Sequence, residues 1–360
     1  MLVKQIGLPT REMPWVPLHV QIEITWKCNW RCVHCYQDDH KTDRYSTQEL
    51  KSLLDDLHAA GTVHLIVTGG EPLVRSDLVE VIRHARKLGM TVTLYTNAHL
   101  VTEDRAKELG GLIGTAEISL LAGEPALHDQ LARAPGSFDR AMRGATLLRQ
   151  QGVNVVIKTP VLRPAYQTLG RLKALMASNG FDWQTDPEIS QSYAGAQFPI
   201  AYKLNKDELR KFFVDFPEFN PQSGVQSNDP GVVNGMCLAG RRFCFIDAIG
   251  NVYPCLNFKN AMDRFSTRLG NVFETPFASI WGEAAVLKEI RSASFGDFKV
   301  CGGCDAKQGC RQCMALNFEE HGSLFQPARI VCGLTKAAVS VFDPYFLPAS
   351  EKLPQTPSMS

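Results

Sequence analysis

The chain has 360 residues, of which 44% are hydrophobic, enough for a large core or for one large domain beside a smaller one. Its 38 basic and 37 acidic residues give a formal net charge of +1 with no basic block, so the attraction that drives phosphate-backbone binding is missing and we expect no nucleic-acid partner. No apolar stretch approaches the length of a bilayer span, and residues 1–17 lack the apolar run of a signal peptide, so we expect a cytoplasmic protein without membrane contact.

Six short apolar runs alternate with amphipathic stretches in the first half of the chain, and we interpret them as strands. Between them, Ser46 and Glu49 form a capping box that predicts a helix, and Ser76 begins another that ends near Gly89. Right-handed crossovers then give an α/β fold, a partial (β/α)6 TIM-like barrel with ligands at the carboxyl ends of its strands. The predicted strands are Leu18 to Thr25, Val63 to Thr68, Thr91 to Thr96, Thr115 to Leu121, Val153 to Pro160 and Phe181 to Pro187.

The second half of the chain is expected to contain little regular structure. It shows one hairpin signal, Phe243 to Tyr253 around Gly250-Asn251, and one helix from about Phe277 to Ser292. Such a region buries little apolar surface, so metal bound by its cysteines is expected to stabilise it. The predicted organisation is an N-terminal extension (1–17), the barrel (18–215), a linker rich in Pro, Gly, Ser and Asn (216–235), a cysteine-rich domain (236–335) and a C-terminal tail (336–360).

Eleven cysteines are many for a chain in a reducing compartment, where disulfides are disfavoured, so metal ligation is the leading explanation. Cys28, Cys32 and Cys35 form C-x3-C-x2-C directly after the first strand. Three thiolates on one loop can bind three irons of a [4Fe-4S] cluster and leave the fourth iron open for chemistry. A zinc site or unrelated thiols are the alternatives.

The second strand ends in Gly69-Gly70-Glu71-Pro72. The two glycines would let a ligand lie against the backbone, and the Glu71 carboxylate can accept hydrogen bonds from an ammonium group. A lone Gly-Gly pair is more often a plain turn. Its position one strand after the cysteine triplet favours a ligand site.

The triplet followed by this GGEP segment resembles the signature of the radical S-adenosylmethionine (SAM) superfamily. The resemblance implies that the open iron chelates the amino and carboxylate groups of SAM, and that Gly69, Gly70 and Glu71 receive its methionine end. Electron transfer from a low-potential donor such as flavodoxin or ferredoxin then releases a 5'-deoxyadenosyl radical. Cys28, Cys32 and Cys35 are the implied catalytic cluster ligands.

Three further residues, His34, Asn97 and Ser119, match positions near the SAM pocket in this superfamily, and Lys158 and Arg133 are candidates on other grounds. His34 would lie beside the adenine, or else be a solvated loop histidine. Asn97 and Ser119 would contact SAM, or else cap strand ends. Lys158 would be costly to bury unpaired, so a carboxylate partner such as that of SAM is expected, and Arg133 either contacts SAM or is an exposed helix arginine.

The remaining eight cysteines resemble the SPASM extension, named for peptide-modifying radical SAM enzymes. The resemblance implies two auxiliary [4Fe-4S] clusters, three clusters in all, which together use all eleven cysteines. A zinc ribbon is the competing interpretation, but only five residues separate the two C-x2-C pairs, short for a ribbon. The spacing of Cys310 and Cys313 is one residue shorter than the family's, which leaves the assignment of Cys313 open. Auxiliary cluster I takes Cys237, Cys244, Cys255 and Cys313, and auxiliary cluster II takes Cys301, Cys304, Cys310 and Cys332.

No thiol is left over in this assignment, which disfavours an epimerase that quenches its substrate radical with a cysteine. An oxidative reaction, with an auxiliary cluster accepting the second electron, is favoured instead. Sulfatase-maturing enzymes place an aspartate after the cysteine that here is Cys255, whereas this chain has Leu256 and Asn257. Asp247 and Asp186 are alternative bases, although each is more simply a turn or surface carboxylate.

The stretch from Asp186 to Ser190 resembles a segment of maturases that act on ribosomally made peptides. We therefore expect a peptide substrate and oxidative crosslinking through a thioether or carbon-carbon bond. Because the first cluster cysteine comes at residue 28, we expect a separate peptide-recognition protein, or recognition by the barrel and tail. The alternatives are a peptide decarboxylase or epimerase, and a small-molecule radical SAM enzyme of cofactor or heme-type biosynthesis. A non-catalytic electron-transfer or metal-storage protein would have no use for the GGEP segment.

Overall fold

One sheet of nine strands organises the molecule. The computed structural model describes residues 15–193, 195, 198–220, 237–304, 310 and 312–342. Within these residues the strand order is β6-β5-β4-β3-β2-β1-β7-β8-β9, and β1 to β6 pair in parallel with their neighbours. All six predicted barrel strands are confirmed: β1 His19–Glu23, β2 His64–Thr68, β3 Thr91–Thr96, β4 Thr115–Ser119, β5 Asn154–Pro160 and β6 Asp182–Asp186.

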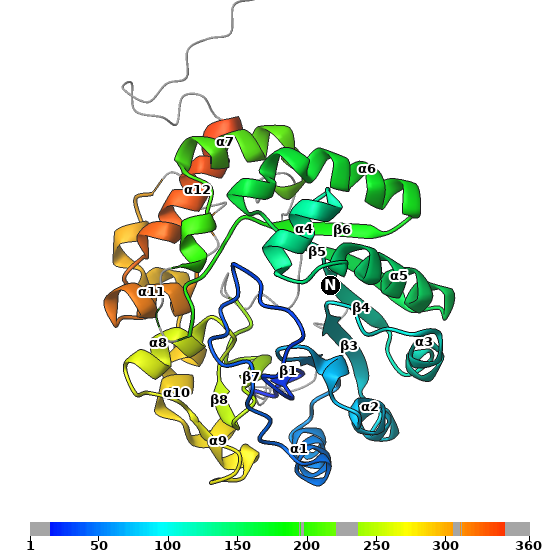
Figure 1. Cartoon of the computed structure of the whole chain (residues 1–360). Helices are drawn as coiled ribbons and strands as arrows, with labels where there is room; N and C mark the ends of the chain where they lie inside the picture. Colours follow the sequence, from blue (N-terminus) through cyan, green and yellow to red (C-terminus); the bar gives the residue numbers. More distant parts are fainter. Residues whose placement is uncertain are drawn as a thin grey trace, which may run out of the picture.

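Helices follow the strands and lie outside the curved sheet (Figure 1). The predicted capping box is present, because the Ser46 hydroxyl accepts from the Glu49 backbone N–H while Glu49 accepts from Ser46. The second helix begins one residue later than expected, with Asp77 as its N-cap. The barrel helices are α1 Thr47–Ala59, α2 Leu78–Lys87, α3 Glu103–Leu109, α4 Pro125–Ala132, α5 Ser137–Gln150 and α6 Leu169–Asn179, with short turns η2 Pro72–Val74 and η3 Arg163–Thr168.

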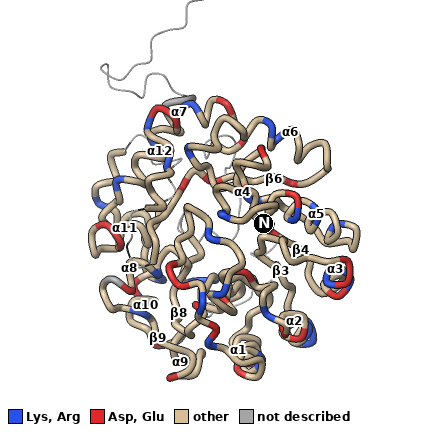
Figure 2. The backbone as a smooth tube through the Cα atoms, viewed as in Figure 1, with Lys and Arg blue, Asp and Glu red and all other residues tan. Residues whose placement is uncertain are grey.

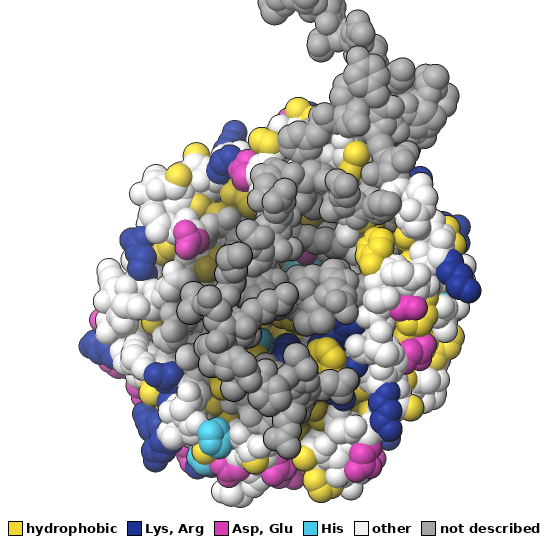
Figure 3. All heavy atoms as spheres, turned by 180° about the vertical axis from the view of Figure 1, so that it is seen from behind, with side chains coloured by type: hydrophobic (Ala, Val, Ile, Leu, Met, Phe, Trp, Pro, Cys, Tyr) yellow, Lys and Arg dark blue, Asp and Glu magenta, His cyan; other side chains and the backbone are white. Residues whose placement is uncertain are grey.

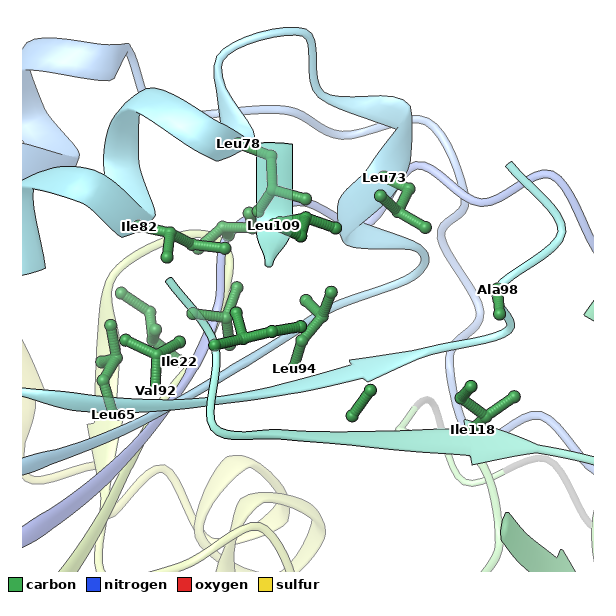
Figure 4. Close-up of a cluster of buried hydrophobic side chains, with 14 of the residues drawn as sticks. Ile22, Leu65, Leu73, Leu78, Ile82, Val92, Leu94, Ala98, Leu109 and Ile118 are labelled. Carbon is green, nitrogen blue, oxygen red and sulfur yellow. The ribbon is translucent and has the colours of Figure 1, made fainter. Parts of the chain in front are cut away.

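The main core lies between the sheet and these helices. Figure 4 shows strand residues such as Leu65 and Val92 facing helix residues such as Leu78 and Ile82. These four side chains are almost completely buried. Because alternate residues of a strand face opposite sides, this packing fixes the register of each strand and therefore the position of the residues at its carboxyl end.

The cysteine-rich region continues the barrel sheet. Strand β7 Phe243–Ile246 pairs in parallel with β1, and β8 Asn251–Tyr253 pairs antiparallel with β7, which confirms the predicted hairpin. A short β9 Gly270–Asn271 follows. The predicted helix from Phe277 to Ser292 is two helices, α9 Phe277–Glu283 and α10 Ala285–Ser292, because Ala284 between them has an extended backbone.

The expectation of little other regular structure in this region is wrong. Three further helices occur, α8 Phe258–Arg264, α11 Met314–His321 and α12 Arg329–Phe342, with short turns η6 Phe295–Asp297 and η7 Lys299–Cys301. Their apolar side chains form a second core that includes Phe258, Met262, Phe298 and Met314. The region therefore buries its own apolar surface, which its short amphipathic runs did not reveal.

The last described helix returns to the barrel. Helix α12 lies beside α7 Lys206–Asp215 (Figure 1), where Ala337 and Ala338 pack against Phe212 and Phe213. The domain boundary expected at residue 335 thus falls inside α12. The expected linker contains η5 Pro217–Phe219, and η4 Pro199–Tyr202 precedes α7. Most of that linker, and the tail after residue 342, lie outside the described residues.

Charges of both signs are spread over the elements (Figure 2), and the opposite side shows basic and acidic side chains mixed around the rim of the described surface (Figure 3). This distribution agrees with the balanced composition. Among the described helices, none has the length and apolar character needed to cross a membrane.

Candidate active site and cluster-binding sites

The cysteine triplet lies on the loop that follows β1. Backbone hydrogen bonds from Arg31 to Ala132 (3.1 Å) and from Val33 to Leu131 (2.9 Å) attach this loop to the end of α4. The three thiols lie close enough to affect one another electrostatically. Burial raises the pKa of Cys32 well above its usual value, and the nearby Cys35 and Cys28 raise it further. The structure therefore brings the three predicted ligands together.

A cavity of about 190 Å3 adjoins the triplet at the carboxyl ends of β2, β3 and β4. It contains most of the residues expected to bind SAM. The lining includes Cys28, Cys32, Cys35, His34, Gly69, Gly70, Asn97 and Ser119. Residues far apart in sequence thus share one wall, although SAM contact by each of them stays a prediction.

The glycines are required by the fold as well as by the cavity. A Cβ atom on Gly69 would lie 2.2 Å from the Thr25 carbonyl oxygen, and one on Gly70 would lie 2.4 Å from those of Trp26 and Lys27. Gly69 also has a φ of +149°. The second strand can therefore approach the triplet loop only without side chains at these positions.

Glu71 is buried beside the triplet and hydrogen-bonded within the protein. Its carboxylate accepts hydrogen bonds from the Thr96 hydroxyl (2.6 Å) and from the backbone N–H groups of Asn97 (2.7 Å) and Leu73 (3.0 Å). The residue is 0% exposed and is not among the described residues that line the cavity. Burial raises the pKa of Glu71 to about 7. Glu71 thus joins the ends of β2 and β3, and its contact with the SAM ammonium stays a prediction.

Lys158, for which a carboxylate partner was expected, pairs with a carboxylate of the protein. Its side chain is 41% exposed and its ammonium lies 3.4 Å from the Glu117 carboxylate on the neighbouring strand. It is not among the described residues lining the smaller cavity. Arg133, in contrast, lies at the C-cap of α4 with a left-handed backbone and lowers the pKa of Cys32, which places its exposed side chain near the triplet.

His34 is neutral at physiological pH, because burial lowers its pKa to about 4. Its Nδ1 atom is buried without a hydrogen-bond partner among the described residues. The ring lines both the cavity beside the triplet and a second, larger cavity. A neutral ring at this junction fits contact with an aromatic base.

The larger cavity has a volume of about 600 Å3 and is continuous in its lining with the smaller one. His34, Tyr36, Tyr95 and Ser119 line both. The remainder of its wall carries charged groups and one residue of the cysteine-rich region, namely Lys158, Glu117, Asp186, Glu188 and Leu256. Tyr36, Tyr95 and Glu188 were not predicted as site residues; the proximity of Tyr36 to Cys35 in sequence was the available signal.

The two aspartates considered as bases have different environments. Asp186 lines the larger cavity, and burial raises its pKa. Asp247 is 0% exposed, accepts from the backbone N–H of Asn251 (2.9 Å) in the hairpin turn, and pairs with the Lys259 ammonium at 2.9 Å. Asp247 therefore stabilises the hairpin and is not a cavity base.

Lys259 belongs to a buried polar network that sequence reasoning missed. Its ammonium also contacts Asp263 (2.8 Å) and lies 4.7 Å from the centre of the Tyr193 ring. Tyr193 in turn donates to Glu23 at the end of β1 (3.2 Å), whose pKa burial raises to about 7. This network joins the barrel to the cysteine-rich region behind the cavity.

The predicted ligands of auxiliary cluster II are brought together. Cys301, Cys304, Cys310 and Cys332 line one small cavity of about 30 Å3. Burial is the largest cause of the raised pKa of Cys301, and the nearby Cys310 and Cys332 are the next largest causes. The Gln312 amide donates to the sulfur atoms of Cys310 (3.3 Å) and Cys301 (3.6 Å).

Only three of the four ligands expected for auxiliary cluster I are together. Burial raises the pKa of Cys255 well above its usual value, and the nearby Cys313 and Cys237 raise it further. Cys244 has a different environment: its side chain lies in the main core and that of Phe245 in the second core, because successive side chains of β7 point to opposite sides of the sheet. Its role as a cluster ligand stays a prediction.

The grouped thiols are suited to metal binding. Buried thiols with raised pKa values need a metal to stabilise their thiolate form. Within the described part of the chain, no three Cys, His, Asp or Glu side chains are grouped tightly enough to hold one metal ion.

Comparison with known proteins identifies two regions. Residues 22–165 match the model of the Radical SAM superfamily, and residues 237–305 match that of an iron-sulfur cluster-binding domain, SPASM. These matches contain the triplet with its cavity and five of the other eight cysteines.

Relatives extend over most of the chain. An AdoMet-dependent heme synthase of Oleidesulfovibrio alaskensis is 31% identical over 336 residues, covering 84% of this chain and 83% of the relative. The mycofactocin maturase MftC of Mycolicibacterium smegmatis is 29% identical over 320 residues, covering 84% and 79%. The structure of Streptococcus suis SuiB bound to S-adenosylmethionine shares the fold, with a TM-score of 0.69 and 19% identity over 90% of this chain and 79% of that one.

Both family matches and the relatives thus agree with the structure, which has the triplet loop with its adjoining cavity, the parallel sheet and the cysteine-rich extension. SAM and iron-sulfur clusters are the cofactors that these families share with the chain. The chain belongs to the radical SAM superfamily and is a radical SAM enzyme with a C-terminal SPASM domain.

Proposed function

We propose that this enzyme oxidatively modifies a peptide, using one SAM-binding cluster and two auxiliary clusters. The single observation that supports the proposal most is the pair of adjoining cavities. The smaller one touches the cysteine triplet, the larger one reaches Leu256 beside Cys255, and four residues line both. A substrate in the larger cavity would lie between the source of a radical and an acceptor for an electron.

The chain's own residues supply positioning and proton transfer. Cys28, Cys32 and Cys35 would hold the first cluster, and Gly69, Gly70, Asn97 and Ser119 would shape the SAM site beside it. When bound, these cofactors supply a 5'-deoxyadenosyl radical that takes a hydrogen atom from the substrate, and the auxiliary clusters supply an acceptor for a second electron.

Oxidation of the substrate also releases a proton, and the cavity offers two carboxylates for it. Burial raises the pKa of Asp186, and burial together with the neighbouring Asp186 charge raises the pKa of Glu188 to about 7. A carboxylate with a pKa near the working pH can both accept and release a proton. Glu188 meets this condition, and both Glu188 and Asp186 line the cavity whereas Asp247 is not among the described residues that do, so either is better placed than Asp247 to act as a general base.

A peptide is favoured because the cavity is open and is lined by the segment from Asp186 to Ser190, which resembles that of peptide maturases. The 29% identity to a mycofactocin maturase supports the same class. We propose oxidative crosslinking as the reaction, with an external low-potential electron donor and a separate peptide-recognition protein as partners. The second candidate is a heme-type small molecule, favoured by the 31% identity to heme synthases.

Cofactor content and SAM cleavage test the first part of the proposal. Anaerobic reconstitution should give about twelve irons and twelve sulfides per chain if three [4Fe-4S] clusters form. Reduced enzyme given SAM should release 5'-deoxyadenosine. A Cys28→Ala, Cys32→Ala, Cys35→Ala triple variant should lose this cleavage and keep about eight irons. Stoichiometric zinc with about four irons would contradict two auxiliary clusters.

Mass spectrometry tests the substrate class. Short peptides encoded beside the gene, and separately an iron-containing tetrapyrrole, are incubated with the enzyme, SAM and reductant. Loss of two hydrogens from a peptide supports crosslinking, whereas loss of carbon dioxide indicates decarboxylation. An unchanged peptide mass calls for a stereochemical assay. Conversion of the tetrapyrrole with every peptide unchanged in mass and stereochemistry would replace the peptide proposal with the second candidate.

A further inference from the structure

A pocket of about 830 Å3 is lined by helices α7 and α12 and by the residues that follow β6. Glu188 lines this pocket and also the larger cavity of the active site. A hollow of about 250 Å3 shares Lys203 and Ile330 with the pocket. The same hollow shares Ile189 and Ser190 with the larger cavity. The three spaces therefore adjoin one another, and a ligand in the pocket can extend to the active site.

The charged side chains around this pocket are mostly basic. Of the described residues that line it, five are lysines or arginines and one, Glu188, carries a carboxylate, whereas the whole chain has 38 basic and 37 acidic residues. Apolar side chains such as Leu209 and Ile330 share the lining. Such a surface favours a ligand that is both negatively charged and partly apolar. The basic residues are Lys203, Lys206, Arg210, Arg329 and Lys336, and together they define the basic pocket.

Ion pairs within the protein use only part of this positive charge. Arg210 lies 3.6 Å from the Asp207 carboxylate, and Arg329 lies 2.6 Å from that of Glu320. The Arg329 side chain is nevertheless 91% exposed. Lys336 is exposed on α12 and forms no ion pair with another described residue. The basic pocket therefore keeps positive charge that a bound ligand can contact.

Two helix ends add charge of the same sign. Helix α7 begins at Lys206 and α12 at Arg329, and the first turns of both line the basic pocket. The two helices lie side by side (Figure 1). The Asn205 side chain already accepts from the backbone N–H groups of Asp207 (3.0 Å) and Glu208 (2.9 Å), so α7 contributes mainly its dipole. The amino-terminal end of a helix dipole is positive and favours an anion.

We propose that the basic pocket binds an acidic segment of the peptide substrate while the reacting residue of the same peptide lies in the larger cavity. Carboxylates of the segment would pair with the lysines and arginines, and apolar side chains between them would pack against Leu209 and Ile330. The basic pocket and the larger cavity together exceed the volume of about 300–1,000 Å3 typical of small-molecule sites, which favours an extended chain. The inference rests on the proposed function, because it names the class of peptide that the enzyme takes.

Model peptides test the charge of the ligand. The acidic probe is Glu-Leu-Glu-Leu-Glu, acetylated and amidated so that only its side chains carry charge, and Gln-Leu-Gln-Leu-Gln is the uncharged control. In calorimetry with the reconstituted enzyme, the acidic probe should bind at least about tenfold more tightly than the control, and its affinity should fall as salt is added. Equal binding of the two probes would overturn the inference, and so would an absence of binding.

Charge variants test the place of binding. Lys206→Gln combined with Lys336→Gln removes one exposed lysine from each helix, and this double variant should bind the acidic probe at least about tenfold more weakly. The matched control combines Lys107→Gln with Lys288→Gln, which are exposed and are not among the described residues of the pocket. It loses the same charge and should keep the affinity within about twofold. Equal weakening in both double variants would place the binding elsewhere and overturn the inference.

A charge reversal distinguishes lost contacts from lost folding. Lys206→Glu combined with Lys336→Glu should bind Lys-Leu-Lys-Leu-Lys more tightly than the parent enzyme does, a gain that a misfolded protein would not show. Because Lys336 and the cluster ligand Cys332 line one small cavity, Lys206→Glu alone repeats the test on α7, away from that cysteine. If neither variant gains affinity for the basic probe, the inference is wrong.

The outcomes separate this inference from the proposed function. An enzyme that modifies a peptide but does not discriminate between the acidic and uncharged probes would retain the proposed function and lose only the acidic segment. A carboxylate-bearing iron tetrapyrrole is tested in the same way. If it loses affinity in the Lys206→Gln, Lys336→Gln variant while the acidic probe does not, the pocket belongs to the second candidate function and the peptide occupant is wrong.

Discussion

Two buried carboxylates near the triplet differ in their acid-base chemistry from free glutamate side chains. Glu71 and Glu23 both have pKa values raised to about 7, in each case mainly by burial. Hydrogen bonds from Thr96, Asn97 and Leu73 partly offset this for Glu71. Because each lies at the end of a strand, its protonation affects how adjacent strand ends are held together.

Glu71 should make the stability of the protein depend on pH. Its folded pKa of about 7 lies above the ordinary value of 4.5, so between these values the folded state keeps a proton that the unfolded state has lost. The free energy of unfolding should therefore fall as the pH rises through this window, by on the order of 1–3 kcal/mol. Glu71→Gln cannot titrate and should show a shallower decline in anaerobic denaturant titrations from pH 5.5 to 7.5.

Glu103→Gln, at an exposed position on α3, is the matched control for this experiment and should retain the slope of the parent protein. An identical slope in the Glu71→Gln variant would show that the carboxylate is ionised throughout the window.

Lys158 should separate substrate use from SAM cleavage. Lys158 lines the larger cavity but is not among the described residues that line the cavity beside the triplet. Lys158→Met should therefore leave 5'-deoxyadenosine release without substrate within about twofold and reduce substrate turnover about tenfold or more, the effect of roughly 1.4 kcal/mol. Lys288→Met, on α10, is the control. A parallel loss of both activities would instead assign Lys158 to the SAM site, as the sequence predicted.

At the level of elements, close approach of β2 to the triplet loop controls the geometry of the site. The backbone N–H groups of Gly70 and Glu71 donate to the carbonyl oxygens of Thr25 and Lys27, each at 2.8 Å. This pairing continues the β1–β2 contact past the strand ends. It holds the cysteine loop against the GGEP segment before any cofactor binds.

Gly70→Ala should disrupt this contact. The new Cβ would lie 2.4 Å from two backbone carbonyl oxygens, which cannot move aside as a flexible side chain could. We expect a loss of stability of roughly 1–3 kcal/mol and weaker SAM binding, measured by denaturant titration and calorimetry. Gly170→Ala is the matched control, because a Cβ there meets nothing within 4 Å and should gain about 0.5–1 kcal/mol in helix α6. Unchanged SAM affinity in Gly70→Ala would show that the loop adapts.

At the level of the whole molecule, the SPASM domain extends the barrel at both ends. Its strand β7 adds to β1, while α12 packs against α7 beyond β6. Helix α12 also carries Cys332, a member of the second auxiliary group. The packing of this helix on the barrel side therefore bears on the position of one cluster ligand.

Phe212→Ala tests this closure. Phe212 is 0% exposed between α7 and α12, and its removal should cost about 3–5 kcal/mol in the free energy of unfolding. Chelators should also remove iron faster from the variant, because the helix that carries Cys332 loses part of its support. Val214→Ala, 59% exposed on the same helix, should change stability by less than about 0.5 kcal/mol. Equal stability of the two variants would mean that α12 does not depend on α7.

Much of the fold and the grouping of the cysteine triplet were predictable because the signals are local. Apolar runs predict the positions of the strands, and Ser46 with Glu49 predicts the start of α1. The spacing of three cysteines predicts the triplet. The helices α11 and α12 were missed because they are stabilised mainly by contacts with distant elements. Tyr95 and Glu188 were missed because a single polar residue gives no sign of the cavity that it lines.

By itself, the sequence determined the cysteine-rich chemistry, the parallel sheet and the membership of residues such as Gly69 and Asn97 in one site. Only the tertiary structure showed that Cys244 lies in the main core and that Glu71 is hydrogen-bonded within the protein. Cysteine spacing cannot say which face of a strand a thiol occupies relative to the others, since that depends on the pairing of β7 with β1. The sequence likewise does not show that the Glu71 carboxylate accepts hydrogen bonds from Thr96 and Asn97 at the end of β3.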